Sequence, residues 1–240
     1  MPDGTGTSAP APTINPIALG RARSSFGSYA SGGGGSLGGS VRDYVHAHRG
    51  AQNATQATRA GRTSTKSLGG FLSGVAQRGV TQTLRDVGLS DVIGSSPITV
   101  VSAILNLITP PGDTLDDAIA RRAESDTMGE LYRRFDLEDG IENFDRMTEA
   151  DVKDTLILSV SNHIFQRFVH TVEKGLQDGN VRPDQAEMAE HDAKEYIRGK
   201  VLVDFGDRDV IHMDWNGTEA TGLIENIFTQ AHIILEEATS

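Results

Sequence analysis

Residues 148–178 read TEADVKDTLILSVSNHIFQRFVHTVEKGLQD, and this stretch decides the fold. Thr148 followed by Asp151 predicts a capping box, in which two side chains satisfy backbone groups at the start of a helix. Large apolar side chains then recur every fourth residue, at Val152, Leu156, Val160, Ile164, Phe168, Val172 and Leu176. Three more, Ile157, Phe165 and Val169, widen the stripe. So wide an apolar stripe predicts a helix at the centre of a core rather than at its edge.

Shorter helical patterns precede and follow this central helix. An apolar pattern over residues 68–87 predicts one helix, although Gly74 and Gly79 weaken it. Ser96 before Pro97 predicts the N-terminus of a short apolar helix that two further prolines end. More helices are expected over about residues 115–135, capped by Asp113 or Thr114, and over about residues 183–201 and 218–237. No run of alternating apolar and polar residues predicts a strand, so the sequence predicts an all-α, multi-helix globular body.

The first forty residues differ from this body in composition. They are rich in Pro, Thr, Ser, Ala and Gly, and end in SGGGGSLGGS at residues 31–40. Such a stretch buries too little apolar surface to offset the entropy of ordering it, so we expect residues 1–40 to be disordered. Residues 41–66 are then a weakly helical linker, and residues 67–240 form an acidic helical domain. Phe26 and Tyr29 are either anchors for a partner or incidental hydrophobes in a loose tail.

Charge is distributed as unevenly as composition. Residues 1–66 carry 7 basic and 2 acidic side chains, whereas residues 67–240 carry 15 basic and 31 acidic ones. The net charges of +5 and −16 make up the total of −11. A basic tail favours weak, salt-sensitive contact with phosphates, but an acidic body repels DNA. Nucleic acid is therefore a possible partner and not the favoured one.

Composition also excludes or disfavours several classes of protein. The chain has no cysteine, which excludes a disulfide framework, a thiolate nucleophile and a cysteine-ligated zinc site. Its start lacks the cationic and then apolar order of a signal peptide. Its longest apolar stretch, residues 97–108, is too short to span a bilayer. We therefore expect a soluble, cytoplasmic protein with no membrane partner.

Motifs that look like catalytic or cofactor sites all lack the context that such sites need. Residues 33–38, GGGSLG, fit a dinucleotide-binding pattern, but no core strand precedes them, so we interpret them as linker. His163 and His170 lie seven residues apart on one helical face, whereas a helical zinc pair needs a spacing nearer three or four. The acidic residues 204–214 lack the spacing and the turn glycine of a calcium loop. We predict no catalytic residue, no metal ligand and no cofactor.

Two other functions stay open beside a non-enzymatic one. The first is a nucleic-acid-binding regulator that uses the basic head, with binding that weakens steeply as salt is added. The second is a metal-dependent enzyme that uses His163, His170 or the acidic residues 204–214. Tightly bound metal in the purified protein would reveal this enzyme, and its absence would dispose of the idea.

Four segments carry a family resemblance. They are SSFGSY at residues 24–29, the glycine-rich tract, SLGG at 36–39 leading into VRDYV at 41–45, and DTLDDAIARR at 113–122. Together these segments resemble the QatB family, the accessory proteins of the four-gene Qat anti-phage system. The resemblance implies partners: an ATPase, a 7-cyano-7-deazaguanine-synthase-like enzyme and a TatD-like nuclease. It implies that the chain itself is a non-enzymatic adaptor or substrate.

The resemblance also implies a role for the start of the chain. Family members often begin with a sequence like Met-Gly-Thr-Ser. Here Gly6-Thr7-Ser8 matches its last three residues, but MPDGT stands in front. Our hypothesis is that the synthase-like partner attaches a deazaguanine-type group to an N-terminal glycine, Gly6 or Gly4, once trimming or a later start has exposed it. An unstructured amine is physically suited to entering another enzyme's pocket.

Overall fold

The computed structural model describes residues 14–109, 112–179 and 181–238, and within these ranges the chain forms helices and loops without a strand. The all-α prediction is confirmed. In chain order the helices are α1 (Pro16–Ala30), α2 (Leu37–Ala47), α3 (Ala51–Gln56), α4 (Arg59–Arg78), α5 (Val80–Asp86), the 3-10 helix η1 (Ser90–Val92), α6 (Pro97–Ile108), α7 (Leu115–Arg134), the 3-10 helix η2 (Ile141–Arg146), α8 (Glu149–Asp178), α9 (Pro183–Lys200) and α10 (Thr218–Glu236). None of these helices is both long and apolar enough to cross a membrane.

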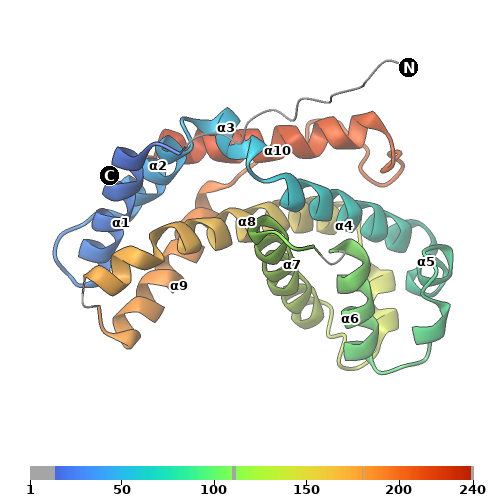
Figure 1. The fold of residues 1–240 in the computed structure, drawn as a ribbon. Coiled ribbons are helices and arrows are strands. Elements are labelled where there is room, and N and C mark those ends of the chain that lie inside the picture. The colour runs from blue at the N-terminus through green and yellow to red at the C-terminus, as the bar shows by residue number, and fades with distance from the viewer. Residues whose placement is uncertain (1–13, 110–111, 180, 239–240) are drawn as a thin grey trace, which may run out of the picture.

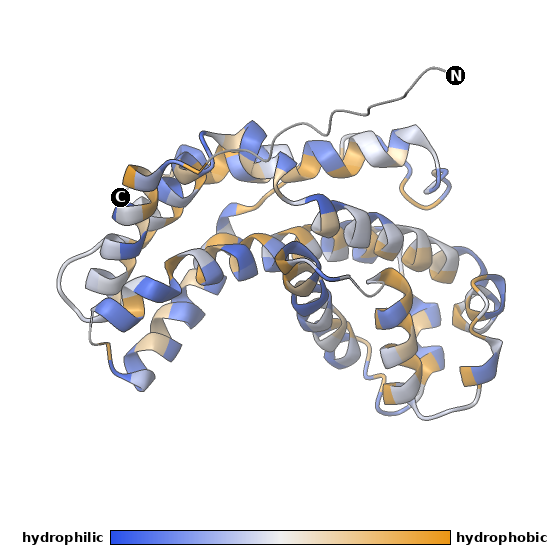
Figure 2. Cartoon of the chain, viewed as in Figure 1, coloured by the Kyte–Doolittle hydropathy of each residue, from blue (hydrophilic) through white to orange (hydrophobic). Residues whose placement is uncertain are grey.

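α8 runs through the middle of the molecule (Figure 1). The seven apolar side chains spaced four residues apart from Val152 to Leu176 are at most 7% exposed. Helices α1, α2, α4, α7, α9 and α10 all pack against α8. In Figure 2 hydrophobic and hydrophilic residues alternate along most helices, as helices with one buried face require. The prediction of a central core helix is confirmed.

Several predicted helix ends are confirmed as well. The Thr148 side chain accepts a hydrogen bond from the backbone of Asp151, whose carboxylate accepts one from the backbone of Thr148, so the capping box of α8 is complete. Ser96 caps α6, and of the two alternatives for α7 the cap is Thr114. These ends are local, because each needs only side chains within three residues of the cap.

The region predicted as one helix over residues 68–87 is divided between α4 and α5. α4 already begins at Arg59, and Gly79 separates it from α5 with a φ of 80°. A positive φ of this size is strained for residues with a side chain, so glycine permits the break. The first backbone N–H of α5, at Val80, donates to the carboxylate of Asp145 (2.7 Å) and fixes the new direction.

The predicted disorder is wrong for residues 14–40, whereas residues 1–13 lie outside the described residues. α1 occupies residues 16–30, and α2 begins inside the glycine-rich tract with Ser36 as its cap. Phe26 is fully buried, and its ring meets that of Phe168 on α8 edge to face at 5.2 Å between centroids. A composition rich in glycine, alanine and serine predicts disorder, but here these small residues let α1 lie close to its neighbours.

The predicted weakly helical linker over residues 41–66 is also different in the structure. These residues lie in α2, α3 and the first turns of α4, and Val41, Tyr44 and Val45 are fully buried. The boundary expected at residue 67 falls inside α4. Tertiary burial, which the local sequence does not reveal, decides the conformation of this region.

Two glycines set the distance between α1 and α8. A Cβ atom added to Gly27 would lie 2.5 Å from the carbonyl oxygen of Gly175, and one added to Gly175 would lie 2.1 Å from the carbonyl oxygen of Arg23. Real Cβ atoms do not approach backbone atoms so closely, so any side chain at either position forces the helices apart. The close contact between α1 and α8 therefore requires glycine at both positions.

We expect Gly175→Ala to lower the free energy of unfolding by about 1–3 kcal/mol, because the added methyl group overpacks a backbone contact. Gly20→Ala is the matched control: Gly20 lies in α1, the other helix of this contact, and no atom approaches its added Cβ within 4 Å. This control should raise stability by about 0.5–1 kcal/mol, since alanine favours a helix over glycine. Urea unfolding followed by circular dichroism measures both changes. Equal effects of the two substitutions would contradict the close contact.

Candidate functional site: a basic groove along α4

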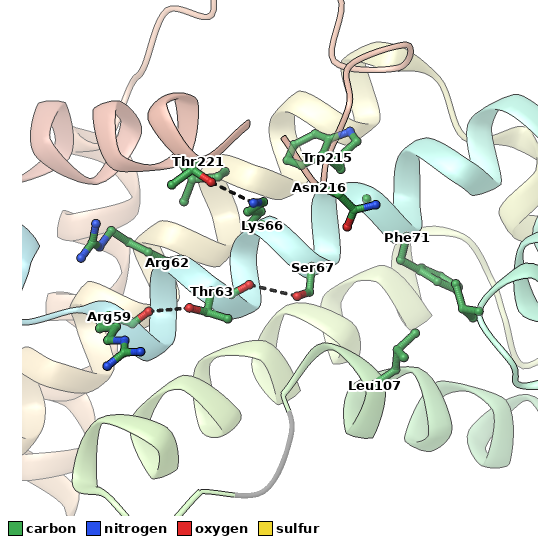
Figure 3. Close-up of a pocket in the computed structure, with 13 residues that line it drawn as sticks. Arg59, Arg62, Thr63, Lys66, Ser67, Phe71, Leu107, Trp215, Asn216 and Thr221 are labelled. Atoms are coloured by element: carbon green, nitrogen blue, oxygen red, sulfur yellow. Dashed lines mark hydrogen bonds between the residues drawn. The ribbon is translucent and has the colours of Figure 1, made fainter. Parts of the chain in front are cut away.

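A groove of about 620 Å³ follows α4 between α10 and α6. Arg59, Arg62 and Lys66 line one end of it, and Phe71 and Leu107 line the other, as Figure 3 shows. The three basic residues are spaced by three and four positions, so the helical repeat brings them to one side of α4. The groove is thus cationic at one end and apolar at the other.

Contacts with α10 hold the two inner cations in place. The Lys66 ammonium donates to the Thr221 hydroxyl (2.8 Å) and to the carbonyl oxygen of Gly217 (3.3 Å). A guanidinium nitrogen of Arg62 lies 3.4 Å from the Glu225 carboxylate, and Arg62 Nε is buried without a hydrogen-bond partner. Lys66 is therefore oriented by neutral oxygen atoms, which leave its charge available to an anion.

A tryptophan from the distant loop before α10 closes one wall of the groove. The indole N–H of Trp215 donates to the carbonyl oxygen of Val210 (3.0 Å), and its ring lies on α4. A Cβ atom on Gly69 would lie 2.2 Å from this ring and one on Gly70 would lie 3.1 Å from the Trp215 side chain. Glycine at these two positions is what lets the loop reach α4.

The opposite side of α4 faces a buried carboxyl group. Glu124 of α7 is 1% exposed and accepts hydrogen bonds from Ser159 (2.6 Å), Ser64 (3.1 Å) and Thr65 (3.4 Å) through one oxygen. Its other oxygen, Oε2, is buried without a partner. Burial raises the pKa of Glu124 to about 7, although the three hydroxyl groups favour the ionised form. α4, α7 and α8 meet at this group.

A second polar contact fixes the N-terminus of α4. The Asp116 carboxylate accepts from the backbone N–H of Ala60 (2.7 Å) and from the Arg167 guanidinium (2.5 Å). The buried His163 ring lies 3.8 Å from the same carboxylate, and burial lowers the pKa of His163, helped by Arg167 and His232. Because Thr58 makes no side-chain cap, Asp116 supplies the cap of α4 from another helix.

The residues predicted for partner binding and modification do not lie in this groove. Phe26 is fully buried, so the prediction that it anchors a partner is wrong for this fold. The Tyr29 hydroxyl donates to Asp192 of α9 (2.8 Å), which ties α1 to α9. Gly4 and Gly6 lie outside the described residues.

The residues considered for a metal site lie apart. His163 is buried and His170 is exposed. Asp204, Asp209 and Asp214 each accept a hydrogen bond from a backbone N–H two residues ahead, so each stabilises a local turn. Within the ranges that the structure describes, no three His, Asp or Glu side chains gather in a way that would hold a metal ion.

Comparison with models of known protein families gives a match. The family model described as Qat anti-phage system associated protein QatB matches residues 50–235, which is more than half of the chain. The chain belongs to the QatB family. The matched range includes every residue that lines the groove and the DTLDDAIARR segment at 113–122, but not the segments before residue 50. Searches of the curated proteins and of the solved structures found no significant match.

Membership of the QatB family makes the chain an accessory component of an anti-phage defence system. The sequence signal for the groove was the spacing of Arg59, Arg62 and Lys66, in a region interpreted as weakly helical. No local signal marked Glu124, because its partners come from α4 and α8.

We expect Glu124→Gln to change how stability depends on pH. The carboxyl group ionises near pH 4.5 in the unfolded chain and near pH 7 in the folded one. Its contribution to stability is therefore complete below pH 4.5 and lost as the pH rises through about 7. A glutamine stays neutral, so the variant should gain about 3 kcal/mol over the wild type between about pH 4.5 and about pH 8.

The measurement is urea unfolding at a series of pH values. Subtracting the wild-type curve from the variant curve cancels the contributions of the buried histidines, which both proteins share. Glu138→Gln, which removes an exposed carboxylate, is the control. A flat difference for Glu124→Gln would mean that Glu124 is not held protonated by burial.

Proposed function

We propose that this QatB protein is a non-enzymatic adaptor whose N-terminal segment is a substrate of the 7-cyano-7-deazaguanine-synthase-like partner. The family match carries the proposal, because it joins the chain to the Qat system. A feature of the body supports it: Ile14 and Ile17, where the described chain begins, are 49% and 71% exposed. The backbone N–H of Asn15 donates to the carbonyl oxygen of Ala47 (2.7 Å), which fixes this entry point at the surface.

The proposed modification uses the α-amino group of Gly6 or Gly4. Once this amine is terminal and unprotonated, it attacks the carbon of an activated deazaguanine acyl group. An amide bond forms, the activating group leaves with the bonding electrons, and the amine loses one proton. Glycine suits this reaction because it has no side chain to hinder the approach.

A small apolar hollow beside the entry point is the proposed docking place of this partner. Ile14, Leu19, Leu115 and Ile119 contribute to its lining, and its volume is about 180 Å³. Leu115 is 55% exposed although it is large and apolar. An apolar contact here would place the partner next to the segment on which it acts. The ATPase and the TatD-like nuclease are the other proposed partners, through surfaces elsewhere on the body.

Intact mass spectrometry with N-terminal peptide mapping tests the proposal. The chain is expressed alone and together with its Qat partners. We expect a mass gain, with or without trimming, that requires the synthase-like partner and maps to the first forty residues. Gly6→Pro and Gly4→Pro remove the primary amine at each candidate position, so one of them should abolish the gain. An unmodified Met1 or Pro2 terminus in the presence of all partners would sink the proposal.

A docking variant tests the hollow separately. Leu115→Glu should reduce the modified fraction by about tenfold, because a charge replaces an apolar contact. The fold should tolerate it, since Leu115 is the first residue of α7 and an acidic residue is favourable there. Met188→Glu is the matched control, because Met188 is 66% exposed on α9 and does not line the hollow. Equal modification of both variants would remove the hollow as docking site.

The alternative function is a nucleic-acid-binding regulator. The sequence suggested this function through the basic N-terminal segment, but two of its arginines contact other parts of the folded chain. Arg23 donates to the carbonyl oxygen of Thr171 (2.8 Å), and a guanidinium nitrogen of Arg21 lies 3.7 Å from the Asp43 carboxylate. The three cations of the α4 groove are what favours it now. This function requires binding of single- or double-stranded oligonucleotides that falls steeply with added salt.

A further inference from the structure

We infer that the α4 groove is a binding site for a nucleoside phosphate, with the phosphates between Lys66, Arg62 and Arg59 and the base at the Phe71–Leu107 end. The inference goes beyond the proposed function, since it concerns the folded body and needs no change at the N-terminus. It rests on the charge of the groove, on the N-terminus of α10 beside it, and on the size and polarity of the groove.

The charge of the groove opposes that of the surrounding body. Three cations lie within about two turns of α4, while residues 67–240 carry a net charge of −16. Among the described residues no carboxylate lies within ion-pair distance of Arg59 or Lys66, although Asp117 interacts with Arg59 at longer range. Glu225, which pairs with Arg62, is 44% exposed. Because the Glu225 carboxylate is the more exposed member of the pair, it stays solvated when a phosphate takes its place beside Arg62. Guanidinium groups bind phosphate through two parallel hydrogen bonds.

The N-terminus of α10 adds backbone donors at the same end. α10 begins at Thr218 after Gly217, and its cap makes no side-chain hydrogen bond. Asn216 and Thr221, on either side of this start, both line the groove. The first N–H groups of a helix attract anions, and Lys66 donates to Gly217 and Thr221 at this same helix start. A Cβ atom on Gly217 would lie 2.9 Å from an Asp214 carboxylate oxygen, so an incoming phosphate replaces this carboxylate as the neighbour of the helix start. Glu219, the acidic residue in the first turn, does not line the groove.

Size and polarity select the class of ligand. The volume of about 620 Å³ lies within the range of small-molecule sites. Lys66 and Phe71 are five residues apart on α4, a rise of about 7.5 Å, which a ribose bridges. Leu107, which is 38% exposed, offers apolar surface to a flat base, and Phe71 and Ile224 also line the groove although they are only 3% and 1% exposed. A bare anion would leave this surface unused, and an apolar ligand would leave the cations unpaired.

Isothermal titration calorimetry of the full-length chain tests the inference with AMP, GMP, ATP and inorganic pyrophosphate at low salt. We expect at least one nucleotide to bind more tightly than pyrophosphate. Arg62→Met and Lys66→Met should each weaken that nucleotide by about tenfold or more. Leu107→Asn should weaken the nucleotide and leave pyrophosphate unchanged. Arg182→Met is the matched control, because this arginine is exposed at the start of α9, outside the groove.

Arg59→Met guards against loss of folding, because Arg59 is exposed and makes no ion pair in the described chain. It should weaken the nucleotide while leaving the unfolding curve unchanged. Absence of saturable nucleotide binding at millimolar concentration overturns the inference, as does equal affinity in all groove variants. Pyrophosphate binding as tight as any nucleotide, or tighter binding of an acidic peptide or an oligonucleotide than of any nucleotide, also overturns it. None of these results bears on the N-terminal mass gain, so the two proposals fail separately.

Discussion

Burial of α8 along almost its whole length is the constraint on which the rest of the structure depends. A helix of 30 residues is about 45 Å long, and one face of α8 is buried along nearly all of this length. Apolar side chains account for most of its buried face, but Ser159, Asn162 and His163 are buried there as well. Ser159 makes hydrogen bonds to Thr65 of α4 and Glu124 of α7, and Asn162 donates to Thr127 of α7, so these buried polar groups help to place α4 and α7.

The buried side of α4 thereby determines where its exposed side lies. Ser64 and Thr65 bind Glu124 in the interior, and Asp116 holds the first turn through Ala60. These contacts fix the rotation of α4 about its axis, so Arg62 and Lys66 point away from α8 toward α10. The groove is a consequence of interior polar contacts and not only of surface charge. If the Glu124 contacts were lost, α4 could rotate about its axis, and this rotation would move Arg62 and Lys66, which lie on the same helix.

Sequence reasoning succeeded where the signal is local and failed where it is not. The α8 stripe, the caps at Ser96 and Thr148 and the all-α class follow from residues within one or two turns of each other. α1 and α2 were missed because glycine and serine are typical of disorder, and only the α8 surface shows that they fit against it. The groove was not predictable because one of its walls is Trp215, which lies far from α4 in sequence. The site of Glu124 was not predictable because its hydroxyl partners come from two other helices.

The fixed entry of the chain at Ile14 sets a tether length. Gly6 lies eight residues before Ile14, and a fully extended chain spans at most about 3.5 Å per residue, so Gly6 reaches no farther than about 28 Å from that point. Any active site that acts on Gly6 must come within this radius while the body stays folded. Only a partner seated against the surface around Ile14, or one with a deep pocket aimed at it, meets that requirement. The hydrogen bond from Asn15 to Ala47 thus anchors a short tether, whose length limits where the partner's active site can lie.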